Sequence, residues 1–284
     1  MRRYGRNRRP QEEIVGVDFS KPVPALMVTM DGVKVDRPGL EVCNYNRAKN
    51  VELGAKPWVR EKVVHEEPIA IVGYGPSLNA TWPRLREFKH IWSTSKAHDF
   101  LLERGIKPEC HFDLDPRAYK ADFITKPQKD IHYVLSTHIH PSYVRKLQHN
   151  HCDISLYHVA IDPKEKVDPR YPSLKARFDV GIQAAEAAFR SGWRDQHWFG
   201  IEYGHEAGNT HAGAHWGVST KQPKCYIDVN GRIFECNRMF FHGLLLAEEF
   251  LCDRALVRIT IHGDGLLGHF IRARGRIPRL KHLI

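Results

Sequence analysis

One short stretch of the sequence has residues suited to holding a phosphate. The stretch Gly73-Tyr74-Gly75-Pro76-Ser77-Leu78 follows an apolar run over residues 69–72. Glycines let a backbone come close to a phosphate, and free amide groups at the start of a helix donate hydrogen bonds to it. An ordinary tight turn between a strand and a helix is the plainer alternative. The residues predicted to bind a nucleotide here are Gly73, Gly75, Pro76, Ser77 and Leu78.

Two acidic residues lie at the end of another predicted strand. Asp113 and Asp115 are two positions apart, so both side chains are expected on one face. At the carboxyl end of a parallel strand, that face borders the ligand crevice. The two carboxylates could hold Mg²⁺ against phosphates, or Asp115 alone could bind the ribose hydroxyls. A charged strand end, with Asp115 capping the next segment, is the alternative.

The elements around these residues predict an α/β fold. From residue 68 onward, short apolar runs alternate with amphipathic segments, which is typical of a Rossmann-like, mostly parallel sheet with helices on both faces. Ser95 follows one such run, where it would contact ribose or base, or would cap a helix. The predicted strands cover residues 69–72, 90–93, 111–114, 133–136, 154–157, 197–201 and 257–261. The predicted helices cover residues 96–105, 142–149, 181–192 and 239–252.

Three regions can be separated along the chain. Residues 1–67 are interrupted by prolines and form an N-terminal extension, in which residues 25–35 predict a β-hairpin around Asp31-Gly32. Residues 68–270 form the predicted nucleotide-binding domain, which includes a second hairpin around Asn230-Gly231. Residues 271–284 form a basic C-terminal tail.

The net charge of +10 lies at the two ends of the chain. Residues 1–9 hold five arginines, and residues 271–284 hold four arginines and one lysine, with no acid in either segment. Such ends suit nucleic acid or another anionic partner, and a solubilising tail without a partner is an equally good interpretation. There is no run of eighteen apolar residues and no secretory leader, so we expect a cytoplasmic protein without a membrane-spanning helix.

The glycine stretch resembles the start of a domain shared by archaeal hydroxymethylpterin diphosphokinases and bacterial motility-associated-factor glycosyltransferases. It is also similar to bacterial sialyltransferases that use CMP-sialic acid. The resemblance extends over about residues 68–265, through segments at 105–116, 181–203, 210–213 and 228–232. It implies a Rossmann-like fold and a nucleotide or nucleotide-sugar donor. Glu202 stands where the family usually has Asp, so its contact with ribose or metal would differ in geometry.

The resemblance also implies a general base in the histidine-containing loop over residues 203–222. In the sialyltransferase-like relatives, a loop histidine takes the proton of the acceptor hydroxyl, which imidazole can do near neutral pH. His211 matches the family's Thr-His-Ala segment, and His215 matches a Gly-x-His segment. Either histidine is a candidate for the base, and exposed loop histidines without a role are the alternative.

These features lead to several hypotheses about function. The first is a transferase with a nucleotide-activated donor, with a preference for glycosyl transfer because of the histidine-containing loop. An ATP- and magnesium-dependent diphosphokinase is the alternative reaction. A non-enzymatic structural or assembly protein, for example in a virus or phage particle, is the alternative class, because a small-molecule enzyme does not need basic ends. An enzyme that acts on nucleic acid through those ends is a further hypothesis. An open crevice would favour an enzyme, and a crevice filled by the chain itself would favour the structural alternative.

Overall fold

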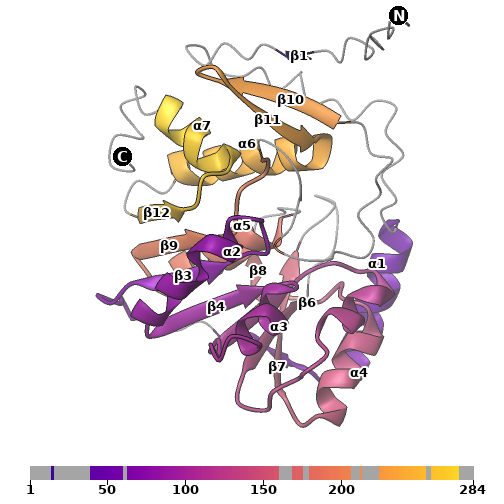
Figure 1. Cartoon of the computed structure of the whole chain (residues 1–284). Coiled ribbons are helices and arrows are strands. Elements are labelled where there is room, and N and C mark those ends of the chain that lie inside the picture. Colours follow the sequence, from indigo (N-terminus) through magenta and orange to yellow (C-terminus); the bar gives the residue numbers. More distant parts are fainter. Residues whose placement is uncertain are drawn as a thin grey trace, which may run out of the picture.

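The computed structural model describes residues 14–15, 39–59, 63–159, 168–174, 179–205, 212, 224–253 and 257–274. Its main feature is a parallel sheet of nine strands, which confirms the predicted α/β, Rossmann-like fold (Figure 1). The strands run across the sheet in the order β12 (Arg258–His262), β9 (Asp195–Phe199), β3 (Ile69–Val72), β4 (His90–Thr94), β5 (Cys110–Asp113), β6 (His132–Ser136), β7 (Asp153–Val159) and β2 (Lys56–Pro57), with β8 (Ser173–Leu174) also paired to β7.

The central strand β3 forms because its residues are apolar on both faces. All four residues of β3 are buried, as a strand covered by helices on both sides requires. Strands β4 to β7 follow β3 in chain order on one side, whereas β9 and β12 lie on the other side. The direction of chain progression therefore reverses between β3 and β9. In open α/β sheets, ligands bind in the crevice outside the carboxyl ends of the strands at such a point.

Helices cover both faces of this sheet (Figure 1). The alanine-rich helix α5 (Val180–Arg190) packs against β3, β4 and β5, and it also contacts α6 (Arg238–Asp253). Helix α3 (Ala97–Leu102) packs on β4, and α4 (Pro141–His149) packs on β7. The short elements α2 (Leu78–Thr81), η2 (Trp82–Glu87) and η3 (Ala118–Phe123) follow β3 and β5.

The second predicted hairpin is present and forms a small separate sheet. Strands β10 (Lys224–Val229) and β11 (Arg232–Asn237) pair antiparallel, and β1 (Ile14–Val15) pairs with β10. Asn230 and Gly231 have φ values of 54° and 84°, as a tight primed turn requires. Helices α6 and α7 (Leu266–Arg274) both contact this hairpin, and α6 lies between it and the main sheet (Figure 1).

The predicted region boundaries differ from the structure at both ends. Helix α1 (Leu40–Glu52) and strand β2 lie within the predicted N-terminal extension, yet α1 packs on α4 and β2 joins the main sheet. Sequence periodicity misses α1 because two of its three buried side chains are asparagines. Helix α7 also continues past residue 270, into the predicted tail. The predicted hairpin over residues 25–35 and the basic segment 1–9 lie outside the described residues.

A row of polar side chains links β12, at one edge of the sheet, with its neighbour β9. The guanidinium of Arg84 can only donate, and it lies 3.1 Å from Nδ1 of His262, so this nitrogen accepts. In a neutral ring the proton is then on Nε2 of His262, which donates to Nδ1 of His197 at 2.8 Å. The His262 ring also stacks on Phe199 with centroids 4.0 Å apart. Burial, with the charge of Arg84 and the neighbouring His197, lowers the pKa of His262 to about 4. The row is therefore built for neutral imidazoles.

Acidification should destabilise the fold through this row. In the unfolded chain His262 is protonated below about pH 6.5, whereas in the folded chain it stays neutral down to about pH 4. Between these two values the unfolded chain binds more protons, so the free energy of unfolding falls as the pH is lowered. Between about pH 7.5 and pH 5, we expect this histidine to account for a loss of about 2 kcal/mol in urea denaturation. His262→Phe should show a smaller loss over the same interval. An equal loss in both proteins would contradict the assignment.

Candidate functional site

The glycine turn after β3 is packed directly against the end of β9. The amide of Gly73 donates to Phe199 O, and the amide of Gly75 donates to Gly200 O, both at 2.8 Å. A side chain at position 73 would begin 2.5 Å from Gly200 O, and Gly200 itself has a φ of 61°. These contacts explain the glycines by a close backbone approach between two strands, without reference to a ligand.

The carboxylate of Glu202 lies at the end of this turn, where a phosphate was predicted. Its Oε1 accepts the amide of Ser77 at 2.7 Å, directly before α2. Burial raises the pKa of Glu202, although the bonds with Ser77 act in the opposite direction. The hydroxyl of Ser77 points to His262 O, 3.5 Å away. The turn amides of Gly73, Gly75 and Ser77 thus donate to the protein itself, and a phosphate at Ser77 would have to displace Glu202.

A second set of predicted residues meets at the carboxyl ends of β4 and β5. Ser95 has a φ of 48°, which is strained for a residue with a side chain, and its hydroxyl accepts from Lys120 Nζ at 3.1 Å. Asp115 lies 3.7 Å from the same ammonium group. Arg117 binds both oxygens of Asp115 through its guanidinium. Burial opposes the ionisation of Asp115, but Arg117 and Lys120 together lower its pKa.

The two aspartates predicted to bind a metal are only partly available for one. Asp113 is 1% exposed, and its Oδ1 accepts the amides of Leu114 and Asp115. Its Oδ2 is buried without a hydrogen-bond partner, and burial raises its pKa. Both oxygens of Asp115 are bound by Arg117. Among the described residues, no three His, Cys, Asp or Glu side chains converge as metal ligands would. A magnesium ion here would therefore have to displace Arg117, and this donor set does not fit it well.

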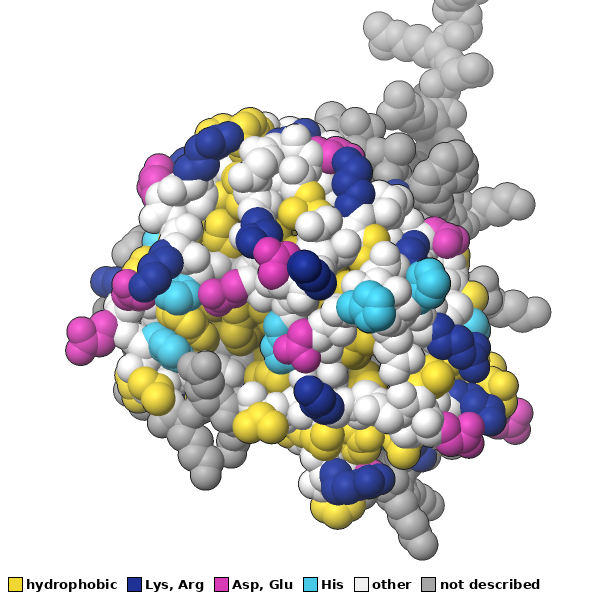
Figure 2. Space-filling model, turned by 90° about the horizontal axis from the view of Figure 1, so that it is seen from below, with side chains coloured by type: hydrophobic (Ala, Val, Ile, Leu, Met, Phe, Trp, Pro, Cys, Tyr) yellow, Lys and Arg dark blue, Asp and Glu magenta, His cyan; other side chains and the backbone are white. Residues whose placement is uncertain are grey.

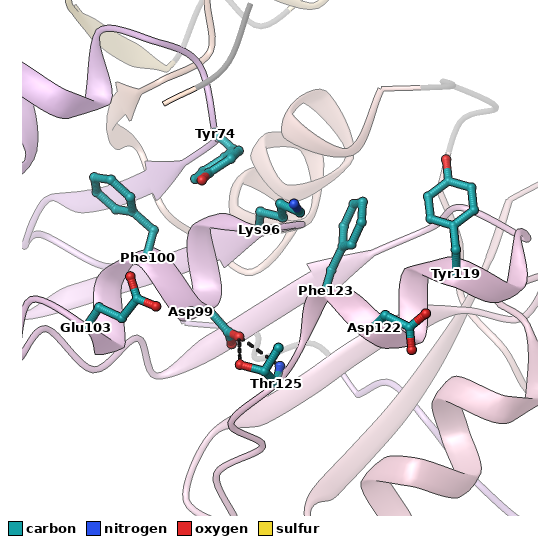
Figure 3. A pocket seen from close by; sticks show the side chains of 9 residues that line it. All are labelled: Tyr74, Lys96, Asp99, Phe100, Glu103, Tyr119, Asp122, Phe123 and Thr125. Carbon is teal, nitrogen blue, oxygen red and sulfur yellow. Dashed lines mark hydrogen bonds between the residues drawn. The ribbon is translucent and has the colours of Figure 1, made fainter. Parts of the chain in front are cut away.

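A cavity of about 660 Å³ opens beside these groups. It lies between Tyr74 of the glycine turn, helix α3 and the η3 segment, so it is at the carboxyl ends of β3, β4 and β5 (Figure 3). The Tyr74 and Phe100 rings meet edge to face at 5.9 Å. The lining residues are Tyr74, Lys96, Asp99, Phe100, Glu103, Tyr119, Asp122, Phe123 and Thr125.

The two candidate catalytic histidines, His211 and His215, lie outside the described residues. Ala212, which follows His211, is described: its amide donates to Tyr74 O at 3.0 Å, and its carbonyl accepts from the Asn79 side chain at 2.9 Å. This part of the loop therefore touches the glycine turn beside the cavity. His205 is buried, and its backbone pairs with Glu235.

Several residues of the site escaped the sequence analysis. Lys96 and Lys120 belong to no motif, and Tyr74 is the variable position of the glycine stretch. Only the fold brings the three side chains together. Asn46 is 1% exposed, and its amide donates to Pro116 O at 3.1 Å and to His138 O at 3.0 Å. It thereby ties α1 to the loop that carries Asp115. The sequence does contain one sign of this helix: Asn46 and Asn50 are one helical turn apart in a segment with few apolar residues.

A family match and one structural neighbour agree with this architecture. The family model of 6-hydroxymethylpterin diphosphokinase MptE-like proteins matches residues 44–208, so the chain belongs to that family. A MAf glycosyltransferase from Magnetospirillum magneticum AMB-1 is similar in structure, with a TM-score of 0.59 and 18% identity over 80% of this chain. This chain spans 37% of that protein's length. A mammalian sialyltransferase in complex with Gal-beta-1-3GalNAc-ortho-nitrophenol aligns with a TM-score of 0.40 and 10% identity, over 80% of this chain and 88% of the other. No curated protein sequence matches.

The surface charges of the described body are mixed. On the face that Figure 2 shows, acidic and basic side chains are interspersed, with histidines among them. An anionic partner for the basic segments 1–9 and 271–284 stays a prediction. None of the described helices has the length and hydropathy that crossing a bilayer requires.

Substitution of Gly200 should test how tightly the turn depends on β9. Gly200→Ala places a Cβ 2.6 Å from Gly73 O at a positive φ, so we expect it to lower the free energy of unfolding by at least about 3 kcal/mol. Gly231→Ala is the matched control, because Gly231 also has a positive φ but nothing lies within 4 Å of its added Cβ. It should cost only about 1 to 2 kcal/mol in the same chemical denaturation experiment. Equal losses would show that the close approach is unimportant.

Proposed function

We propose that the protein is a transferase that takes a nucleotide-activated donor into the crevice at the carboxyl ends of β3, β4 and β5. The observation that carries this proposal is the cavity of about 660 Å³, bordered by aromatic rings, a lysine and the glycine turn. Aromatic faces can stack on a base or sugar ring, and ammonium groups can bind phosphate. The match to a family described as diphosphokinase-like supports a nucleotide-dependent transferase.

Within this class we favour glycosyl transfer from a nucleotide sugar. Diphosphate transfer from ATP depends on magnesium to neutralise and position the phosphates. The carboxylates of Asp113 and Asp115 offer one unpartnered oxygen between them, and it is buried, which weighs against a magnesium site here. In glycosyl transfer, His211 or His215 would take the proton of the acceptor hydroxyl. The family description keeps the diphosphokinase as the alternative reaction.

A structural or assembly role is the second candidate, and one observation favours it. Glu202 fills the position at Ser77 where a donor phosphate would bind a glycine turn, as expected of a scaffold that no longer needs its ligand. The cavity beside Tyr74 argues in the other direction, because it remains open in the same crevice.

A thermal-shift screen separates these functions. We would test CMP, CDP, UDP, GDP, ADP and ATP, each with and without Mg²⁺. One nucleotide at about 100 times its dissociation constant should stabilise the protein by about 2.7 kcal/mol. Tyr74→Ala should reduce the shift because Tyr74 lines the cavity, whereas Tyr45→Ala, an exposed tyrosine on α1, should leave it unchanged.

Each result of the screen has a direct meaning. A shift that does not need Mg²⁺ supports glycosyl transfer, and a shift that requires Mg²⁺ supports the diphosphokinase. If no nucleotide gives a shift, the transferase proposal fails and the structural role gains. If Tyr74→Ala and Tyr45→Ala behave alike, the nucleotide does not bind in this cavity.

A further inference from the structure

The side chain of Glu202 lies in a narrow space between two glycines. An added Cβ on Gly75 would begin 2.7 Å from Glu202 Oε1 and equally close to Gly200 O. An added Cβ on Gly265 would begin 2.6 Å from Glu202 Cβ and 2.9 Å from its Oε2. Neither Gly75 nor Gly265 has a φ in the left-handed region, so their conformation alone does not require glycine. The missing side chains at both positions make room for the Glu202 carboxylate.

Glu202 connects three segments that are distant in the sequence. Its Oε1 accepts the amide of Ser77 at 2.7 Å, at the end of the glycine turn. Its backbone carbonyl accepts the amide of Leu267 at 2.8 Å, in the first turn of α7. Glu202 itself belongs to the loop after β9, and it is 6% exposed. One buried residue therefore ties the glycine turn and the start of α7 to the loop after β9.

Tyr74 is the residue of the glycine turn that lines the cavity, so the conformation of the turn decides where its ring lies. The ring meets Phe100 edge to face, with centroids 5.9 Å apart (Figure 3). The amide of Gly75, next to Tyr74, donates at 2.8 Å to the carbonyl that follows β9, and two residues further on Ser77 donates to Glu202. Loss of the bond at Ser77 would free the end of the turn and let the Tyr74 ring leave the cavity wall.

We infer that Glu202 is a positioning residue for the cavity: its carboxylate holds the glycine turn so that the Tyr74 ring forms part of the cavity wall. Glu202 then acts through Tyr74 and does not touch the nucleotide. The second glycine of the turn, Gly75, serves a carboxylate of the chain itself rather than a phosphate. The inference rests on the proposed function only for what the cavity binds, because the contacts of Glu202 form without a ligand.

Hydrogen–deuterium exchange on the full chain tests the contact without any ligand. Glu202→Ala removes the acceptor of the Ser77 amide, so this amide should exchange at least about tenfold faster than in the unmodified protein. Glu202→Gln keeps an oxygen acceptor at the same reach and should exchange at nearly the unmodified rate. Glu186→Ala is the matched control, because Glu186 is also buried but pairs with Arg190 on α5, and it should leave the Ser77 amide unchanged.

The nucleotide found in the thermal-shift screen tests the link to Tyr74. Glu202→Ala should weaken its Kd about tenfold, as Tyr74→Ala should, because both remove the ring from the cavity wall. The double variant Tyr74→Ala/Glu202→Ala should bind no more weakly than Tyr74→Ala alone, since Glu202 acts through Tyr74. Glu202→Gln should restore the unmodified Kd. Glu186→Ala should keep that Kd even where it lowers the melting temperature.

The two arms separate the inference from the proposed function. If Glu202→Ala leaves exchange at Ser77 unchanged, the inference fails whatever the nucleotide screen shows. If exchange accelerates but no nucleotide binds, Glu202 still holds the turn and the transferase proposal is rejected. Additive losses of affinity in the double variant, or tighter binding by Glu202→Ala, would show that Glu202 acts on the nucleotide directly and would refute the positioning role. Should Glu202→Ala not fold, Glu202→Asp decides, because its shorter carboxylate withdraws from the Ser77 amide.

Discussion

The close approach of the backbone at the ends of β3 and β9 is the constraint on which the rest of the crevice depends. Gly73 and Gly200 are within van der Waals contact through their backbones, and no side chain fits between them. This contact lies where the order of the strands reverses, so it fixes the two loops that border the crevice. It also carries Glu202 to the amide of Ser77 and leaves Tyr74 facing the cavity.

The positions of the main strands could be predicted well because their apolar runs are short, continuous and bounded by turn residues. The strand β3 and the turn at Asn230-Gly231 are examples in which local pattern and tertiary structure agree. Helix α1 was missed since its buried face uses Asn46 and Asn50, whose partners are distant backbone carbonyls. Periodicity of apolar residues carries no information about such contacts.

The candidate site could be predicted only in part. The sequence located Ser95, Asp113 and Asp115 at the ends of predicted strands, and in the structure they lie at the carboxyl ends of the neighbouring strands β4 and β5. The glycine stretch was interpreted as a phosphate cradle, but a pattern of glycines does not distinguish close approach to a ligand from close approach to another strand. Lys120 has no motif, because its place in the site comes from burial and from its contact with Ser95.

Helix α1 also has a consequence for how the protein can be divided. Asn50 donates to the carbonyls of Thr137 and Ile139, and Asn46 donates to those of Pro116 and His138. These four carbonyls belong to the loops after β5 and β6, and two asparagines on one helix supply their donors. A fragment that begins at residue 68 would retain every glycine and aspartate of the predicted motifs, yet it would leave those carbonyls without donors and the Asp115 loop without its anchor. The smallest fragment that keeps these hydrogen bonds therefore begins before α1, upstream of the glycine stretch.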